Sequence, residues 1–261
     1  MEKMEAPVAL ITGGSRGLGF ETAKALAAQG FELILLAKDA ERLQLAEKEI
    51  STAAQLSAVN PSTTSGTPRL STYAVDLENP IATSEALEKI ALAHPNITHL
   101  VLAHGVMSEK MSKTLKTTDQ EWRRVMSINL DSVFQIVNRL APAIVDARNG
   151  RIIIFSACLG RMSGPGNAGG LAPYRISKAG VNALVRNLAH ETGLGSRGVL
   201  VDAICPNHSR TDMGGPDAPR SAAEGAETAI WLATREFDKA SDDFTKNTTG
   251  VLWEDHQIVP W

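Results

Sequence analysis

Short apolar runs alternate with longer stretches of helical period along this chain. Six short runs are predicted strands, and most of them are rich in Val, Ile and Leu without strict polar alternation, which is typical of strands covered on both faces. They lie at 8–12, 32–36, 71–75, 98–103, 151–157 and 199–204. Apolar residues recur with the period of an amphipathic helix at 18–29, 39–50, 80–93, 118–147, 173–191 and 221–234. This order predicts a single α/β domain over residues 1–261, in which helices cover both faces of a doubly wound parallel sheet.

Two segments do not fit this alternation. Residues 51–70 form a run rich in Ser, Thr, Pro and Gly, which predicts a mobile surface insertion, with a partner-docking loop as the alternative. Residues 205–220 contain three prolines and two glycines and follow the carboxyl end of a predicted strand. Open α/β sheets bind their ligands at that end, so this segment is predicted to be a substrate-covering loop.

Composition narrows the class of protein. The 261 residues include 26 Lys and Arg against 29 Asp and Glu, and this balance argues against a nucleic-acid binder, which needs a basic excess. The two cysteines, Cys158 and Cys205, make neither a disulfide framework nor a zinc site, so no metal is expected. No apolar run reaches the roughly 18 residues of a membrane span, and the start lacks the apolar stretch of a signal peptide. A cytoplasmic protein without a membrane partner is the expectation.

The first predicted strand leads into a glycine-rich turn that is followed by a helix. Glycines allow tight turns and close approach, and the free N–H groups at a helix N-terminus favour a pyrophosphate. This context predicts a dinucleotide site, whereas a purely structural turn is the alternative. The candidate contacts in the turn are Gly13, Ser15, Arg16, Gly17, Leu18 and Gly19.

Five motifs in the same order resemble the short-chain dehydrogenase/reductase family over almost the whole chain. They are the Thr-Gly-x-x-x-Gly-x-Gly turn, Asp76-Leu77, Asn129 in Ile-Asn-Leu, Tyr174-x-x-x-Lys178, and Cys205-Pro206 followed by residues 210–214. The last residues, 249–261, are similar to the tails of carbonyl-reductase-like members. The resemblance implies a Rossmann-type fold, a nicotinamide cofactor and a small-molecule carbonyl or alcohol substrate.

The same resemblance implies further cofactor contacts. Asp76 and Leu77 would hold the adenine, and Thr211 would contact the carboxamide or a phosphate. The remaining contacts that it implies are Ala103, Gly105, Tyr174, Lys178 and Pro206. Members of the family often associate through two long helices, which correspond here to those carrying Asn129 and Tyr174, so a homodimer or homotetramer is expected.

The residues after the second predicted strand indicate which nicotinamide cofactor is used. An NAD site usually has a carboxylate there to bind the ribose hydroxyl, but alignment to the family places Ala37 at that position. Lys38 and Arg16 could instead bind a 2′-phosphate through charge-assisted hydrogen bonds. The sequence therefore favours NADP(H), unless the two cations are merely solvated.

Tyr174 and Lys178 are four residues apart, so on a helix both side chains point the same way. A phenol has a pKa near 10, and a neighbouring ammonium would lower it toward neutrality. Tyr174 is therefore the candidate acid/base group. By resemblance, Lys178 would also hold the nicotinamide ribose, and Asn129 would anchor a water that supplies protons. An ordinary surface pair is the alternative.

Several positions depart from the family pattern. Relatives carry two serines after the fifth strand, but here Ala157 replaces the second, which helps to hold the substrate oxygen. Ser156 matches the first serine and faces the opposite side of the strand, and Ser163 is a substitute by position alone. His104 and His208 lie at the expected cofactor edge, either as new substrate or acid/base groups or as structural residues.

These features predict an NADP(H)-dependent oxidoreductase that reduces a ketone or aldehyde of a small to medium apolar molecule, or oxidises the alcohol. Losing one oxyanion-type donor costs about 10²–10³ in rate. The second hypothesis is therefore a non-redox isomerase, cyclase or dehydratase on the same fold. A catalytically silent cofactor-binding protein is the third.

Overall fold

The computed structural model describes residues 6–57, 69–109 and 112–261, and it confirms the predicted α/β class. The strands described form one sheet in the order β3-β2-β1-β4-β5-β6-β7-β8, in which every neighbouring pair up to β7 is parallel and β8 is antiparallel. Their bounds are β1 Val8–Thr12, β2 Glu32–Ala37, β3 Leu70–Ala74, β4 His99–Leu102, β5 Gly150–Phe155, β6 Val199–Ile204, β7 Leu252–Glu254 and β8 Gln257–Val259.

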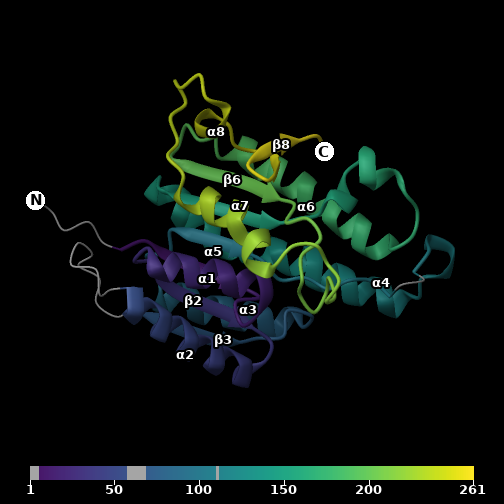
Figure 1. Ribbon diagram of the computed structural model, residues 1–261, viewed down its shortest axis with the longest axis horizontal. Helices are drawn as coiled ribbons and strands as arrows, with labels where there is room; N and C mark the ends of the chain where they lie inside the picture. Colours follow the sequence, from purple (N-terminus) through teal and green to yellow (C-terminus); the bar gives the residue numbers. More distant parts are fainter. Residues whose placement is uncertain (1–5, 58–68, 110–111) are drawn as a thin grey trace, which may run out of the picture.

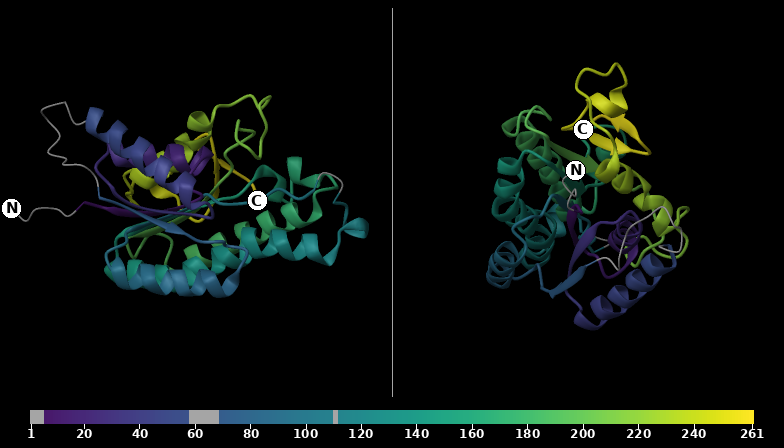
Figure 2. Two further views of the ribbon diagram at one scale, coloured as in Figure 1. Left: turned by 90° about the horizontal axis from the view of Figure 1, so that it is seen from below. Right: turned by 90° about the vertical axis from the view of Figure 1, so that its left-hand side faces the viewer.

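Helices cover both faces of the sheet (Figures 1 and 2). One face packs against α1 Gly17–Ala28, α2 Ala40–Ser57 and α7 Ala222–Thr234. The other packs against α3 Pro80–Ala93, α5 Ser132–Ala147 and α6 Ala172–Glu191. The short helix α4 Asp119–Met126 precedes α5, and α8 Phe244–Asn247 precedes β7. Among the described residues, no helix has the length and apolar character needed to cross a bilayer.

Most predicted elements are confirmed within one or two residues of their bounds, but two of the helix predictions are wrong. The helix predicted over 39–50 continues to Ser57, so the first part of the expected 51–70 insertion is helical and Leu70 already begins β3. Residues 58–68 of that prediction lie outside the described residues. The strand predicted over 151–157 ends at Phe155. The long helix predicted over 118–147 is divided by a five-residue π-helical stretch, Ser127–Asp131.

The antiparallel hairpin β7–β8 was not predicted, and a buried carboxylate anchors it to β6. Asp202 Oδ1 accepts hydrogen bonds from the Trp253 Nε1 and Gly250 N atoms, both at 3.0 Å. Its second oxygen lies 3.0 Å from Arg235, and both charged side chains are almost completely buried. A buried charge needs partners of this kind, so the C-terminal segment is held against β6 and extends the sheet beyond that strand.

The candidate site lies where the chain leaves two adjacent strands in opposite directions. β1 and β4 are paired neighbours, yet β1 continues into α1 on one face while β4 leads to α4 and α5 on the other. Such a switch point leaves a crevice beyond the carboxyl ends of the strands, where doubly wound folds bind ligands.

Candidate active site

The glycine turn after β1 is packed too closely for other side chains. Gly13 and Gly17 have φ values of +65° and +57°, which favour glycine. A Cβ at Gly13 would lie 3.2 Å from the backbone of His104, and one at Gly19 would lie 2.5 Å from the Gly13 carbonyl oxygen. The glycines therefore allow the turn to approach β4 and the start of α1.

The N-terminus of α1 has no side-chain cap. Its N-cap residue Arg16 makes no capping hydrogen bond, and the first turn has no acidic residue. In contrast, Asn79, Thr118 and Ser221 cap α3, α4 and α7 through their side chains. The first N–H groups of α1 are thus left for an anion, which the helix dipole also favours.

The cations predicted to bind a 2′-phosphate form ion pairs at the edge of the turn. Lys38 lies 2.7 Å from the Asp76 carboxylate, and Arg16 pairs with Asp212. The sequence analysis missed Arg42, which lies 3.6 Å from the same Asp212 carboxylate. Arg42 belongs to no recognised motif, and it reaches this corner only because the fold places the first turn of α2 there. A phosphate bound here would replace carboxylates as the partner of these cations.

The 205–220 loop reaches back over the glycine turn. Its Thr211 methyl group would lie 3.2 Å from a Cβ at Gly17, and Asp212 pairs with Arg16. On the catalytic side, Met213 Cε lies 3.9 Å from the place of a Cβ at Gly105. Both ends of the candidate site are therefore in contact with this loop.

Tyr174 and Lys178 are brought together on α6, and both are buried. The Lys178 ammonium lies 6.0 Å from the centre of the Tyr174 ring and donates a 2.7 Å hydrogen bond to the Phe155 carbonyl at the end of β5. Ser108, which no motif marked, accepts a 2.8 Å hydrogen bond from Tyr174 N and so satisfies an N–H of the first turn of α6.

Asn129 lies in the π-helical stretch, and π-helical turns occur frequently at functional sites. Its Oδ1 accepts a 2.8 Å hydrogen bond from Val106 N, and its Nδ2 donates to the Val106 carbonyl and to Ser177 Oγ. A Cβ at Gly105 would lie 3.4 Å from Asn129 Oδ1 and 3.5 Å from Lys178 Nζ. The polar ends of Asn129 and Lys178 therefore meet beside Gly105.

Burial dominates the protonation of this couple. Desolvation raises the pKa of the Tyr174 phenol above its usual value, and charge on Cys205 or Cys158 would raise it further. Burial lowers the pKa of Lys178 to about 8. The pKa of the phenol is therefore shifted in the direction opposite to the lowering expected from Lys178, and desolvation is the main cause. Tyr174 is consequently protonated at neutral pH.

Neither candidate serine points a free hydroxyl at Tyr174. Ser156 is buried and donates to Asn182 Oδ1 on α6. Ser163 donates to the Trp261 carbonyl oxygen at 3.3 Å. Ala157 itself is 8% exposed. Both hydroxyls are therefore engaged with other protein groups, and their substrate roles stay predictions.

His104 is bonded through both ring nitrogens. Ser132 Oγ donates to the Ile128 carbonyl and therefore accepts from His104 Nε2 at 2.8 Å. Thr12 Oγ1 then donates to His104 Nδ1 at 2.6 Å. Burial and the charge of Lys178 lower the pKa of His104 to about 3. The structural alternative for this residue thus fits better than an acid/base role.

His208 lies exposed on the 205–220 loop. Its Nε2 lies 2.8 Å from the Gly214 carbonyl oxygen, and the preceding Asn207 has a φ of +58°, which asparagine tolerates. His208 therefore closes a bend within the loop, and this contact occupies one of its two ring nitrogens.

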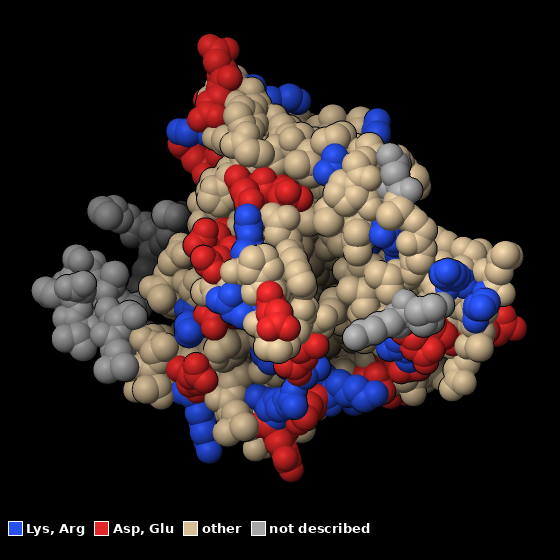
Figure 3. Space-filling model, turned by 45° about the vertical axis from the view of Figure 1, so that its right-hand side comes forward, with Lys and Arg blue, Asp and Glu red and all other residues tan. Residues whose placement is uncertain are grey.

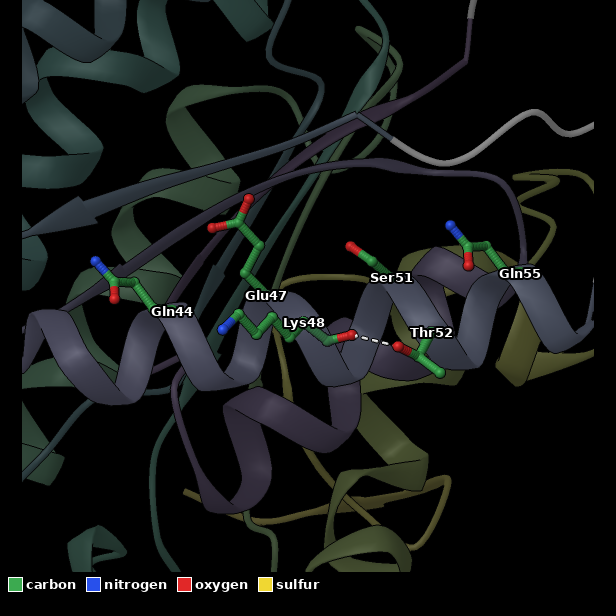
Figure 4. Close-up of a pocket in the computed structure, with 6 residues that line it drawn as sticks. All are labelled: Gln44, Glu47, Lys48, Ser51, Thr52 and Gln55. Atoms are coloured by element: carbon green, nitrogen blue, oxygen red, sulfur yellow. Dashed lines mark hydrogen bonds between the residues drawn. The ribbon is translucent and has the colours of Figure 1, made fainter.

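The surface charges and the hollow along α2 can be compared with the position of the site. Figure 3 shows acidic and basic side chains interspersed over one side of the molecule, consistent with the paired charges at the glycine-turn corner. The hollow in Figure 4 runs along α2 and has only polar lining residues, among them Lys48, whose carbonyl accepts a hydrogen bond from Thr52 at 2.8 Å. None of its lining residues belongs to the candidate site.

The chain belongs to the short chain dehydrogenase family, whose profile matches residues 7–221. It is 30% identical over 209 residues to the 3-oxoacyl-[acyl-carrier-protein] reductase of Escherichia coli K12, a match that covers 80% of this chain and 76% of the relative. The reductase of the same name from Thermotoga maritima is 27% identical over 231 residues, with coverage of 88% and 85%.

Solved structures with the same fold share less sequence. A short chain dehydrogenase of Salmonella enterica serovar Typhi has a TM-score of 0.76 at 22% identity, covering 96% of each chain. A Shigella flexneri short chain dehydrogenase in complex with NADP has a TM-score of 0.75 at 21% identity, covering 94% of this chain and 95% of that one. Carveol dehydrogenase of Mycobacterium avium, in complex with NAD, has a TM-score of 0.75 at 22% identity, with coverage of 97% and 96%.

The neutral His104 makes a testable contribution to stability. Its folded pKa of about 3 lies below the ordinary histidine value, so its contribution is complete above about pH 6.5 and is lost as the pH falls toward 3. Relative to His104→Gln, wild type should lose about 2 kcal/mol of unfolding free energy between pH 7 and pH 5. Urea unfolding at the two pH values measures this difference. Equal losses in both proteins would show that folding does not lower the pKa of His104.

Proposed function

We propose that this protein is an NADP(H)-dependent oxidoreductase that interconverts a ketone or aldehyde of a small to medium apolar molecule and the corresponding alcohol, with Tyr174 as acid/base. The observation that carries the proposal is the buried Tyr174–Lys178 couple beside Gly105, at the same edge of the sheet as the uncapped glycine turn. Membership of the short chain dehydrogenase family and the named activity of the Escherichia coli relative support carbonyl reduction.

The residues present fit a dinucleotide. The glycine turn and the free N–H groups of α1 would hold its pyrophosphate. Asp76, Leu77 and Ala103 would line the adenosine side, and Gly105, Pro206 and Thr211 the nicotinamide side. Arg16, Lys38 and Arg42 supply positive charge where a 2′-phosphate would lie, and Ala37 offers no carboxylate to repel it. The NADP complex of the Shigella flexneri neighbour supports this choice of cofactor.

When bound, the reduced nicotinamide supplies the hydride that the carbonyl carbon receives. The protonated Tyr174 donates its phenolic proton to the carbonyl oxygen as negative charge develops there. Lys178 stabilises the phenolate that remains. With its pKa lowered to about 8, Lys178 can pass a proton to that phenolate and recover one from solvent. In the direction of alcohol oxidation the same groups take up the proton.

The 205–220 loop is proposed to cover the substrate. Met213 brings an apolar side chain to the catalytic side, while Thr211 and Asp212 connect the same loop to the glycine turn. Ala157 and Cys158 add small apolar groups at the end of β5. These surroundings suit an apolar molecule that presents one polar carbonyl to Tyr174.

Removing the phenolic proton tests the chemistry. Tyr174→Phe should lower NADPH-dependent ketone reduction by about 10²–10⁴ because the general acid is lost, while leaving NADPH affinity nearly unchanged. The chain has one other tyrosine, Tyr73 on β3, whose hydroxyl lies 2.9 Å from His94 Nε2, so Tyr73→Phe is the matched control. Absorbance at the NADPH band follows turnover, and calorimetry measures binding. Undiminished turnover in Tyr174→Phe would rule out this assignment.

The charged corner can be tested by cofactor preference. Lys38→Ala should weaken NADPH binding about tenfold or more, because a charge-assisted hydrogen bond contributes about 1.5–3 kcal/mol. NADH binding should change little, since NADH lacks the phosphate. Lys24→Ala is the matched control, because Lys24 lies on α1 and pairs with Glu21 away from this corner. Titration calorimetry with both nucleotides measures the ratio. Equal losses for NADH and NADPH would contradict a phosphate contact.

The non-redox alternative rests on Ala157 in place of the family serine. If the chain is a reductase that lacks one donor, Ala157→Ser should raise its turnover by about 10²–10³. If it is an isomerase, cyclase or dehydratase, product should form without net NADPH consumption and the added hydroxyl should give no such gain in reduction. Parallel assays of NADPH oxidation and product formation, on wild type and Ala157→Ser, distinguish the two.

A further inference from the structure

The two cysteines of the chain meet beside the candidate active site, although 47 residues separate them. Cys158 follows the end of β5 and Cys205 follows the end of β6, and these strands are parallel neighbours. The Cys158 backbone N–H donates a 3.1 Å hydrogen bond to Cys205 Sγ. Both side chains pack on the face of the sheet that α6 covers. The mechanism proposed above uses neither thiol.

The two thiols differ in exposure and in acidity. Cys205 is 2% exposed, whereas Cys158 is only half-buried. The contact with Cys205 lowers the pKa of Cys158 to about 7, while the same contact and burial raise the pKa of Cys205. A nucleophilic, accessible thiolate beside a protonated, protected thiol is the arrangement of an attacking and a resolving cysteine.

We propose that Cys158 and Cys205 are an oxidation site that forms a reversible intramolecular disulfide when the chain meets a hydroperoxide. The inference goes beyond the proposed carbonyl reduction and does not require it. Two observations support it: the contact between the two residues and the exposure of Cys158.

The chemistry balances with a hydroperoxide as the oxidant. The Cys158 thiolate attacks one peroxide oxygen, so that an S–O bond forms, the O–O bond breaks, and an alkoxide or hydroxide leaves with the electron pair. The sulfur of Cys205 then attacks the sulfenic sulfur of Cys158, which forms the S–S bond and breaks the S–O bond. The departing hydroxide takes the Cys205 proton and leaves as water. Two thiols are oxidised by two electrons, and the hydroperoxide is reduced to an alcohol or water.

Oxidation would act on the candidate active site through the turn that begins at Cys158. That turn, Cys158–Gly160, packs against α6 so closely that a Cβ at Gly160 would lie 2.7 Å from Lys178 Cβ. A covalent link from Cys158 to β6 would hold this turn in a new position beneath Lys178. The disulfide is therefore expected to lower turnover reversibly.

The test treats the full chain with hydrogen peroxide at neutral pH, then denatures and alkylates it and measures its intact mass. Wild type is expected to lose the mass of two hydrogen atoms and to accept no alkyl group, and dithiothreitol should restore both thiols. Cys205→Ala should instead add oxygen at Cys158, several-fold more slowly because its thiolate is no longer stabilised. Cys158→Ser should keep an alkylatable Cys205. The variant lacking both cysteines is the control for methionine oxidation, including that of the partly exposed Met213, because any oxygen added to it must lie elsewhere than on a cysteine.

Two results would overturn the proposal. One is oxygen added at Cys158 of wild type while Cys205 remains alkylatable. The other is a disulfide that appears only between two chains. Turnover of oxidised wild type, before and after dithiothreitol, is a second readout that rests on the proposed function. If the intact mass shows the disulfide but the chain reduces no ketone, the inference about the two cysteines is supported and only the proposed function is contradicted.

Discussion

The structure depends on the close approach of the chain to itself where β1 and β4 end. Gly13 has no side chain, so the turn after β1 lies against the backbone at His104, and the N–H groups of α1 point into the crevice between the diverging connections. His104 strengthens the same junction by joining Thr12 at the end of β1 to Ser132 in α5. A larger residue at Gly13 or Gly19 would separate these segments, and the anion site would lose its geometry.

Burial explains the protonation of the Tyr174–Lys178 couple. Removing water raises the pKa of Tyr174 and lowers that of Lys178, so the two values move apart. A phenolate formed at Tyr174 would therefore be the stronger base of the two and would take up a proton from the Lys178 ammonium. Ser156 and Ser163 donate their hydroxyl hydrogens to other protein groups, and Ala157 has no hydroxyl.

Pattern and motif predicted the fold well where local sequence decides it. The strands at 8–12 and 199–204 and the helix at 80–93 were predicted at their observed bounds, because buried strands need continuous apolar runs and Asn79-Pro80 is a strong helix start. Predictions failed where packing decides. Helix α2 extends through a polar segment, and β7 and β8 are short strands whose place comes from Asp202, a partner about fifty residues away.

The sequence by itself determined the order of elements, the family and the positions of the glycine turn, Asn129, Tyr174 and Lys178, since each depends on residue type and local spacing. Tertiary structure alone decided which side chains remain free for chemistry. It bonds both nitrogens of His104, turns Ser156 toward α6, adds Arg42 to the charged corner and brings Cys158 to Cys205. These outcomes arise from contacts between residues that are distant in the chain. The periodicity of a single segment does not show which other segments it will contact.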